Sequence, residues 1–269
     1  ARSILMNREM QTLKQALHSA GKVLLRYFGK TSYKLKGPSN LLTKADLESQ
    51  RTVLSLIKRE FPAHDYMAEE DAAKNTGSRF LWILDPLDGT TNYAHGFPAA
   101  CVTMALLKDG KPVLGGTYDP FRDELFLAAR GKGATLNGRR MRVSTVSKLS
   151  EALLITGFAY DRAQRGKFYC SFFLDFIKIC HDARRSGSAA LDMAWTAAGR
   201  VDGFWEFKLN PWDVAAGRLL VEEAGGKVSD FSGTPWHKPG DYGAQTLATN
   251  RKIHPAMLSI IKRGLAKYS

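Results

Sequence analysis

The sequence predicts a mixed α/β fold made of two subdomains, residues 1–148 and 149–269, with a cleft between them. Helix-like and strand-like segments alternate in the first part of the chain, strand-like segments separated by turns dominate its middle, and strands and helices alternate again towards its end. This order fits two α/β units better than one doubly wound sheet.

Two helices open the N-terminal subdomain. Apolar residues recur at helical spacing over residues 6–28, and a glycine follows as a stop signal. Residues 34–40 form a polar loop that contains glycine and proline. Beyond it, Thr43 and Asp46 form a capping-box pattern, which predicts a second helix over residues 44–61.

Strands fill the rest of the N-terminal subdomain. Residues 66–68 form a short strand, a polar loop follows, and the apolar residues 81–84 form a buried strand. Residues 100–129 predict a mainly antiparallel sheet, because residues 108–110 and 119–122 have the composition of turns. Further glycine and Asn-Gly turns continue the hairpin pattern beyond it.

The C-terminal subdomain returns to alternating strands and helices. Strands are expected at residues 153–156, 184–186 and 201–207, and helices at residues 168–179, 188–198, 214–224 and 255–265. Ser188 has the character of a helix N-cap, and glycines follow two of the helices as stop signals.

Composition places the chain among ordinary soluble globular proteins. It has 269 residues, of which 44% are hydrophobic and 10% aromatic. The longest apolar run, residues 99–107, is too short to span a bilayer, and no secretory signal pattern is present. We therefore expect a cytoplasmic protein without a membrane segment.

Cysteines and histidines do not form a disulfide or zinc framework. The three cysteines, Cys101, Cys170 and Cys180, lack a Cys-x-x-Cys pair, and the six histidines are scattered. Reduced thiols are the usual state in a cytoplasm. Carboxylates are then the remaining candidates for metal ligands.

The chain is strongly basic, with 39 Lys and Arg against 26 Asp and Glu and a formal net charge of +13. This charge favours anionic partners such as phosphorylated metabolites or a nucleic-acid backbone. Most cations are spread out as a solvated surface, and tight clusters occur at residues 139–142 and 184–185. Because no aromatic residues interleave with them as in a base-stacking platform, nucleic-acid binding is a minor hypothesis.

Residues 85–92, with the sequence DPLDGTTN, are the most informative segment. Asp85 follows a predicted strand, so it lies at a strand's carboxyl end, where α/β folds bind ligands. A buried ionised carboxylate needs a cation or a hydrogen-bond network, and Pro86 turns the backbone sharply. The two aspartates and the Leu87 carbonyl then form an all-oxygen set suited to Mg²⁺. The structural alternative is that Asp85 and Asp88 only form a turn and a helix cap.

A second acidic signal lies far along the chain. Asp213 precedes the helix predicted from residue 214, where the positive end of the helix dipole favours anions. Taken alone, Asp213 would be a helix N-cap. With residues 85–92 and the pair Glu69 and Glu70, it forms a set that resembles the inositol monophosphatase family of Mg²⁺-dependent, lithium-sensitive phosphatases.

The resemblance spans nearly the whole chain, from residue 36 to residue 226. Residues 184–192 and 199–203 look most like the bacterial extragenic-suppressor branch of the family. The resemblance implies a homodimer. It also implies a layered αβαβα sandwich of the inositol monophosphatase and fructose-1,6-bisphosphatase type, with two sheets flanked by helices. One departure is Asn40, where the family usually has aspartate.

The resemblance also implies two or three Mg²⁺ ions in each active site. Glu69, Asp85 and the Leu87 carbonyl would hold the first ion. Asp85, Asp88 and Asp213 would hold the second, with Asp85 as the bridge between them. Glu69 would also hold a weaker third ion through water.

Catalytic and substrate roles carry over from the family in the same way. Thr90, paired with Asp46, would orient and help deprotonate the attacking water, with Glu69 completing the catalytic set. The N–H groups of Gly89 and Thr90 would receive phosphate oxygens. The implied substrate-binding residues are Lys36, Asp88, Gly89, Thr90, Ala190, Glu206 and Asp213.

Several of these residues have plain structural alternatives. Lys36 lies in a polar loop and Glu206 on a strand, so each is also explained as a solvated charge or a strand-edge carboxylate. Thr156 and Ser188 are expected to line the same pocket. The arginines at 184–185 suit a dimer interface as well as a substrate.

Two classes of function follow. The leading hypothesis is a phosphate monoesterase that acts on inositol 1-phosphate or a similar polyol phosphate. Enzymes of the same fold use fructose 1,6-bisphosphate, histidinol phosphate or 3′-phosphoadenosine 5′-phosphate, and the metal ligands do not distinguish these substrates. The alternative is a regulatory protein that binds RNA or the transcription machinery, which the basic charge motivates.

Overall fold

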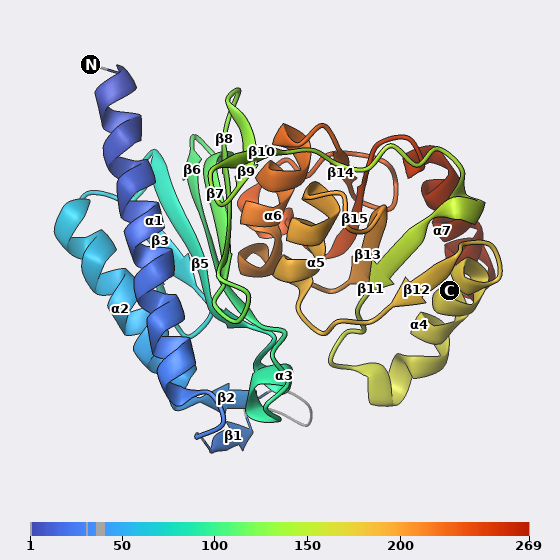
Figure 1. The fold of residues 1–269 in the computed structure, drawn as a ribbon, viewed down its shortest axis with the longest axis horizontal. Coiled ribbons are helices and arrows are strands. Elements are labelled where there is room, and N and C mark those ends of the chain that lie inside the picture. The colour runs from blue at the N-terminus through green and yellow to red at the C-terminus, as the bar shows by residue number, and fades with distance from the viewer. Residues whose placement is uncertain (1, 31, 36–40, 269) are drawn as a thin grey trace.

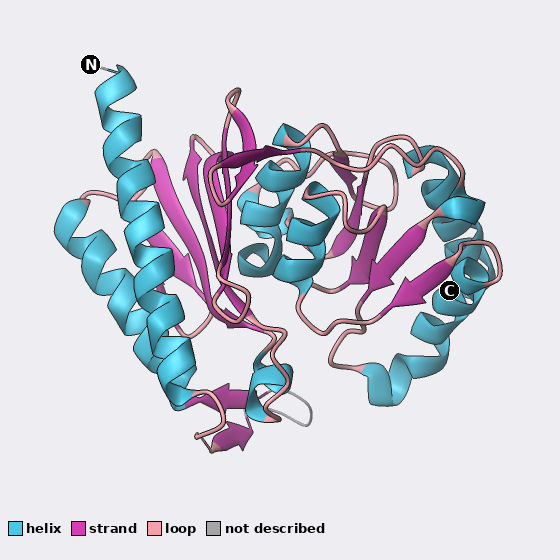
Figure 2. Ribbon diagram, viewed as in Figure 1, coloured by secondary structure: helices cyan, strands magenta, loops and turns pink. Residues whose placement is uncertain are grey.

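The computed structural model, which describes residues 2–30, 32–35 and 41–268, has five layers. A helix pair, a sheet, a second helix pair, a second sheet and a third helix pair follow one another across the molecule (Figures 1 and 2). The pairs are α1 (Arg2–Tyr27) with α2 (Lys44–Glu60), α5 (Ala189–Ala197) with α6 (Pro211–Glu223), and α4 (Arg162–Ile177) with α7 (His254–Tyr268). This arrangement confirms the expected αβαβα sandwich.

The first sheet has eight strands in the order β10-β9-β8-β7-β6-β5-β3-β4. They are β3 (Asp65–Ala68), β4 (Asp71–Lys74), β5 (Phe80–Asp88), β6 (Cys101–Lys108), β7 (Lys111–Asp119), β8 (Glu124–Ala129), β9 (Gly133–Leu136) and β10 (Arg139–Met141). Only β3 and β5 pair in parallel. The antiparallel pairing of β6, β7 and β8 confirms the prediction for residues 100–129.

The second sheet has five strands in the order β12-β11-β13-β15-β14. They are β11 (Leu153–Thr156), β12 (Asp182–Arg184), β13 (Gly203–Phe207), β14 (Lys227–Ser229) and β15 (Gln245–Thr249). Strand β11 runs parallel to both β12 and β13, whereas β15 is antiparallel to its two neighbours. Smaller elements are the hairpin of β1 (Tyr33–Leu35) and β2 (Leu41–Thr43), helix α3 (Thr90–Ala94), and 3₁₀ turns at Leu149–Glu151 and Pro239–Asp241.

Helix α6 is buried between the two sheets because most of its surface is apolar. It packs closely on the first sheet: a Cβ added to Gly115 of β7 would lie 3.0 Å from the carbonyl oxygen of Ala216. The helix also contacts β5. Since α6 carries Asp213 in its first turn, this packing sets the position of that carboxylate relative to the end of β5.

Some boundaries differ from the predictions. Helix α4 begins at Arg162 rather than at residue 168, and β12 ends at Arg184 rather than at residue 186. Residues 34–40 were expected as a loop, yet residues 33–35 and 41–43 pair as a hairpin. Lys36 and Asn40, which were singled out in the sequence, lie outside the described residues.

Strands β4, β14 and β15 were not predicted. A polar loop was expected after residue 71, and residues 71–74 lack the β-branched and aromatic residues typical of strands. Pairing along the edge of β3 makes them a strand. Along the described part of the chain, no helix is long and apolar enough to cross a bilayer.

A buried histidine predicts how stability depends on pH. The His254 side chain is 1% exposed, with Nε2 3.0 Å from Ser229 Oγ and Nδ1 3.0 Å from Thr249 Oγ1. Burial, with help from Lys227 and Arg251, lowers its pKa to about 4. Below pH ~6.5 the unfolded chain takes up a proton that the folded protein binds only near pH 4, so stability is lost as the pH falls.

Between pH 7 and pH 5, we expect the free energy of unfolding to fall by about 2 kcal/mol more in the wild type than in His254→Gln. Urea unfolding at both pH values measures this difference. All other titrating groups are shared by the two proteins, so equal losses would contradict the assignment.

Candidate functional site

A sharp turn ends strand β5 at its carboxyl edge. The pairing of β5 with β6 shifts register between Asp85 and Asp88, which releases the residues between them from the ladder. The Leu87 N–H donates to Asp85 Oδ1 at 2.9 Å, and Ser49 Oγ donates to the Pro86 carbonyl at 2.8 Å. The turn is therefore held from within and from helix α2.

Gly89 completes this turn in a conformation that other residues avoid. Its φ is 90°, and an added Cβ would lie 2.8 Å from the carbonyl oxygen of Ala99. Helix α3 starts directly after it. The backbone N–H groups at residues 89–90 therefore sit beside the two aspartates, on the lining of one cavity.

Asp213 joins the two aspartates of the turn. Carboxylate oxygens of Asp85, Asp88 and Asp213 all lie within 4.8 Å of one another. Asp213 was expected at a helix start, with the N-cap as its structural alternative; Asn210 is the N-cap, and Asp213 is the third residue of α6. Its Oδ2 accepts the Asn210 N–H at 2.7 Å in a capping box, which fixes the side chain.

The three carboxylates repel one another in a buried place. Burial raises the pKa of Asp85 well above its usual value, and the charges of Glu69, Asp88 and Asp213 raise it further. Burial raises the pKa of Asp88 to about 6, although hydrogen bonds from Ser188 and Ala190 oppose the shift. A clustered, oxygen-only ligand set of this kind fits a hard divalent cation such as Mg²⁺, which would neutralise it.

Glu69 lies on the wall of the same cavity, next to the end of β3. Its backbone N–H donates to the Leu84 carbonyl at 3.3 Å, which ties it to strand β5. Glu70 also lines the cavity, and its N–H donates to Gln50 Oε1 at 3.0 Å. The acidic wall thus combines two strand ends and the first turn of α6.

The structure brings Thr90 and Asp46 together beside this wall. Thr90 Oγ1 lies 3.3 Å from Asp46 Oδ1 and 2.9 Å from the Leu87 carbonyl oxygen. Asp46 Oδ2 accepts the Thr43 N–H at 2.7 Å and the Thr43 hydroxyl at 2.6 Å, which confirms the predicted capping box. Thr90 lines the cavity, and the buried Asp46 stands behind it.

The cavity has a volume of about 570 Å³ and is built by both halves of the chain. Residues 69–91 and Asp213 supply the acidic wall, and residues 157–162, 185–192 and 206–212 supply the opposite side. Of the residues singled out in the sequence, those on the lining are Glu69, Glu70, Asp85, Leu87, Asp88, Gly89, Thr90, Arg185, Ser188, Glu206 and Asp213.

Three other predicted residues do not reach the cavity lining. Ala190 is buried behind Asp88, where its N–H donates to Asp88 Oδ2 at 2.8 Å, so it supports a carboxylate rather than facing a ligand. Thr156 is buried and donates to the Trp205 carbonyl at 2.6 Å. Arg184 instead forms an ion pair with Asp182.

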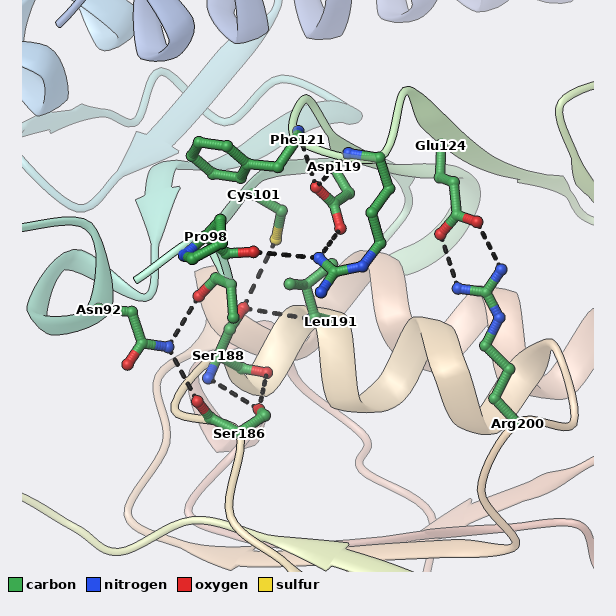
Figure 3. A network of polar contacts seen from close by, with 12 residues as sticks. Asn92, Pro98, Cys101, Asp119, Phe121, Glu124, Ser186, Ser188, Leu191 and Arg200 are labelled. Atoms are coloured by element: carbon green, nitrogen blue, oxygen red, sulfur yellow. Dashed lines mark hydrogen bonds and ion pairs between the residues drawn. The ribbon is translucent and has the colours of Figure 1, made fainter. Parts of the chain in front are cut away.

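The segment before α5, which carries Ser186 and Ser188 (Figure 3), holds Asp88 from the side of the second subdomain. Ser188 caps α5 and also donates its hydroxyl to Asp88. Asn92 Nδ2 donates to the carbonyl oxygens of Ser186 and Ala99, both at 2.8 Å. These bonds couple the two sides of the cavity at its acidic end.

Sequence reasoning missed part of the opposite wall. Tyr160 lines the cavity from the loop after β11, Arg162 from the start of α4, and Trp212 from the first turn of α6. Burial and the nearby carboxylates raise the pKa of Tyr160, which keeps its hydroxyl protonated. The rule that ligands bind beyond strand ends, applied to the strand at residues 153–156, would have pointed to this loop.

Comparisons with known proteins point to one family. The model of the inositol monophosphatase family matches residues 6–265. An inositol-1-monophosphatase of Synechocystis sp. is 42% identical over 248 residues, 91% of this chain and 85% of that protein. A Nus factor SuhB of Pseudomonas aeruginosa is 40% identical over 256 residues, 92% of this chain and 93% of that protein. The crystal structure of the extragenic suppressor protein suhB from Bartonella henselae matches with a TM-score of 0.89 at 37% identity, over 95% of this chain and 98% of that one.

Proposed function

This chain belongs to the inositol monophosphatase family, and we propose that it is a Mg²⁺-dependent phosphate monoesterase that prefers inositol 1-phosphate or a similar polyol phosphate. Family membership supports phosphatase activity in general. The carboxylate cluster of Asp85, Asp88 and Asp213 beside a cavity of about 570 Å³ is the observation that carries the proposal.

We assign the ligands for two or three Mg²⁺ ions to the acidic wall. Glu69, Asp85 and the Leu87 carbonyl would hold one ion, and Asp85, Asp88 and Asp213 another. Bound there, Mg²⁺ would acidify a water molecule and neutralise phosphoryl oxygens. The fit rests on the oxygen-only donors and on their mutual repulsion in a buried place.

The chain's own residues would position the water and the phosphate. The Thr90 hydroxyl would hold the attacking water and pass its proton towards Asp46, to which it is already hydrogen-bonded at 3.3 Å. The N–H groups of Gly89 and Thr90 would receive phosphate oxygens. Water attacks phosphorus in line with the leaving alcohol oxygen, and the P–O bond to that alcohol breaks.

The opposite wall would hold the alcohol. Glu206 lines the cavity as a buried carboxylate, so it suits hydroxyl donors. Arg185 and Ser188 lie on the same wall. The role of Lys36 as a residue that closes over the site stays a prediction, because Lys36 lies outside the described residues.

A panel of phosphate esters tests the substrate. With Mg²⁺, we expect the highest kcat/KM for inositol 1-phosphate, and lower values for fructose 1,6-bisphosphate, histidinol phosphate and 3′-phosphoadenosine 5′-phosphate. EDTA should abolish all turnover, and a lithium titration in the same assay tests the expected lithium sensitivity. Rapid hydrolysis of another ester beside negligible turnover of inositol 1-phosphate would reject the preference.

Other expectations from the family stay proposals. They are a homodimer, which sedimentation would test, a cytoplasmic location, and the division into subdomains 1–148 and 149–269. Two separate sheets, one in each part, support the division. Separate expression of the two parts would test it.

We propose binding of structured RNA as a second function, because one basic surface suits a polyanion. Arg139, Arg140, Arg142 and Arg200 line a hollow of about 650 Å³, which we call the arginine hollow. Arg200 pairs with Glu124, whereas no described carboxylate pairs with the other three. Several relatives are named Nus factor SuhB, and this name motivates a test of RNA binding.

Replacing Arg139, Arg140 and Arg142 together by alanine should weaken RNA binding and lower the slope of log K against log[salt] by about 2 to 3. The matched control replaces Arg8, Arg26 and Arg79 by alanine. This removes the same total charge, but each of these arginines is paired with a carboxylate. Phosphatase activity should survive in both variants. Equal RNA affinities for both would contradict a specific surface.

A further inference from the structure

Glu206 has an unusual setting within the cavity. It lies on β13, its residue is 7% exposed, and no described residue donates a hydrogen bond to its carboxylate. An ionised carboxylate can only accept hydrogen bonds. Its free acceptor capacity therefore faces the cavity, where a ligand hydroxyl would meet it.

Gly157 makes room for this carboxylate. Thr156 and Trp205 are partners in the parallel pairing of β11 with β13, so the next residues, Gly157 and Glu206, lie side by side. A Cβ built on Gly157 would lie 2.2 Å from both carboxylate oxygens of Glu206. No other glycine among those described would place a Cβ so close to a cavity-lining side chain.

Space, not backbone conformation, is what requires glycine here. Gly157 is absent from the residues with positive φ, so an L-residue fits its backbone without strain. An oxygen at 2.2 Å must move by about 1 Å to reach the 3.4 Å of ordinary contact. A methyl group at this position would therefore act only sterically, against the carboxylate of the neighbouring Glu206.

Three charged neighbours of Glu206 lie on the cavity lining. Asp192 and Asp88 repel its carboxylate, and Arg185 attracts it. Asp192, Asp88 and Arg185 all line the same cavity. Glu206 lines the cavity as well, so a carboxylate displaced from Gly157 towards Arg185 would enter the space that the alcohol part of a substrate needs.

We propose that Gly157 is a specificity-determining residue, because its missing side chain seats Glu206 against the wall and leaves room for a hydroxyl-rich alcohol. This inference rests on the proposed phosphatase function. It concerns a positioning residue, since Gly157 acts through Glu206. The substrate class that it selects is the phosphate ester of a neutral polyol.

The test compares Gly157→Ala with Gly166→Ala. Gly166 lies in α4, and a Cβ added there meets no atom within 4 Å. Two substrates are used, inositol 1-phosphate and p-nitrophenyl phosphate, whose aryl group offers no hydroxyl to Glu206. Thermal unfolding of each variant is followed in parallel.

We expect Gly157→Ala to lower kcat/KM for inositol 1-phosphate about 10- to 100-fold, mainly through KM. The value for p-nitrophenyl phosphate should fall less than about 3-fold, so the ratio of the two substrates changes at least several-fold. Gly166→Ala should leave both values within about 2-fold. An unchanged substrate ratio in a folded Gly157→Ala protein would overturn the proposal.

A double variant separates a local effect from a folding defect. Glu206→Asp shortens the side chain by one methylene and leaves space for the methyl group. Adding Gly157→Ala to Glu206→Asp should therefore cost less than about 3-fold, which is far from additive. A double variant that loses activity additively, or that fails to fold, would overturn the proposal.

Failure of the proposed substrate stays distinguishable from failure of this inference. If the wild type cleaves another polyol ester of the panel instead of inositol 1-phosphate, the inositol preference fails. The Gly157 variants are then measured with that ester against p-nitrophenyl phosphate. The same change in ratio supports the inference, and its absence overturns it.

Discussion

Replacing Asp85 by asparagine is expected to lower kcat/KM about 10³-fold or more while the fold stays intact. Asp85 is the carboxylate that we assign to both metal positions, so its loss removes two ligand contacts at once. Asparagine keeps the side-chain oxygen that accepts the Leu87 N–H at 2.9 Å, so the turn should persist. Steady-state assays across a Mg²⁺ titration measure the loss.

Thermal unfolding gives an independent reading of the same variant. Without metal, Asp85 is buried among Glu69, Asp88 and Asp213, whose charges raise its pKa and disfavour its ionised form. The neutral asparagine should therefore raise Tm in EDTA. Mg²⁺ should raise Tm of the wild type and have much less effect on the variant.

Asp65→Asn is the matched control. Asp65 is also buried, but it accepts hydrogen bonds from Thr76 and Ser78 and does not line the cavity. It should lower Tm without a comparable loss of kcat/KM. Activity of Asp85→Asn that recovers fully at saturating Mg²⁺ would contradict the bridging role.

The parts of the site that the sequence predicts well are local. The capping box of Thr43 and Asp46 and the turn after residue 84 depend on neighbours within a few positions. Such patterns have a physical meaning before the chain folds, because caps and turns satisfy nearby backbone groups. Their geometry in the structure follows the expectation closely.

Asp213 shows where local reasoning stops. Its placement at a helix start was predicted, but Asn210 is the N-cap and Asp213 is the other partner of the capping box. Two polar residues three positions apart suit either assignment when the helix start is uncertain by a few residues. Proline at residue 211, favoured at the first helical position, is the signal that decides it.

The opposite wall of the cavity depends on tertiary packing. Tyr160 comes from the loop after β11 and Trp212 from the first turn of α6, and the packing of α6 between the sheets brings Trp212 to the cavity. Strands β14 and β15 likewise exist because β15 pairs with β13 and β14 pairs with β15. Neither the packing of α6 nor the pairing of these strands leaves a pattern within one segment of the sequence, and neither was predicted.

Thr90→Ala is the second change with a large expected effect. Its hydroxyl lies 2.9 Å from the Leu87 carbonyl oxygen and 3.3 Å from Asp46 Oδ1, on the wall that faces the phosphate. If this hydroxyl holds the water and moves its proton, kcat should fall about 10²-fold or more with little change in KM. Asp46→Asn should lower kcat by a similar factor, because asparagine still accepts a hydrogen bond from Thr90 but cannot take up the proton.

Thr12→Ala separates catalysis from stability. Thr12 is buried, and its hydroxyl also donates to a carbonyl oxygen at 2.9 Å, that of Arg8, but it lies on α1 and does not line the cavity. Both alanine variants lose a buried hydrogen bond, which costs about 1 kcal/mol. Similar falls in Tm with a loss of kcat only in Thr90→Ala would support a catalytic hydroxyl. Equal kcat values for Thr90→Ala and Thr12→Ala would instead show that the Thr90 hydroxyl only stabilises the turn. The proton of the water would then have to pass to one of the carboxylates of the acidic wall.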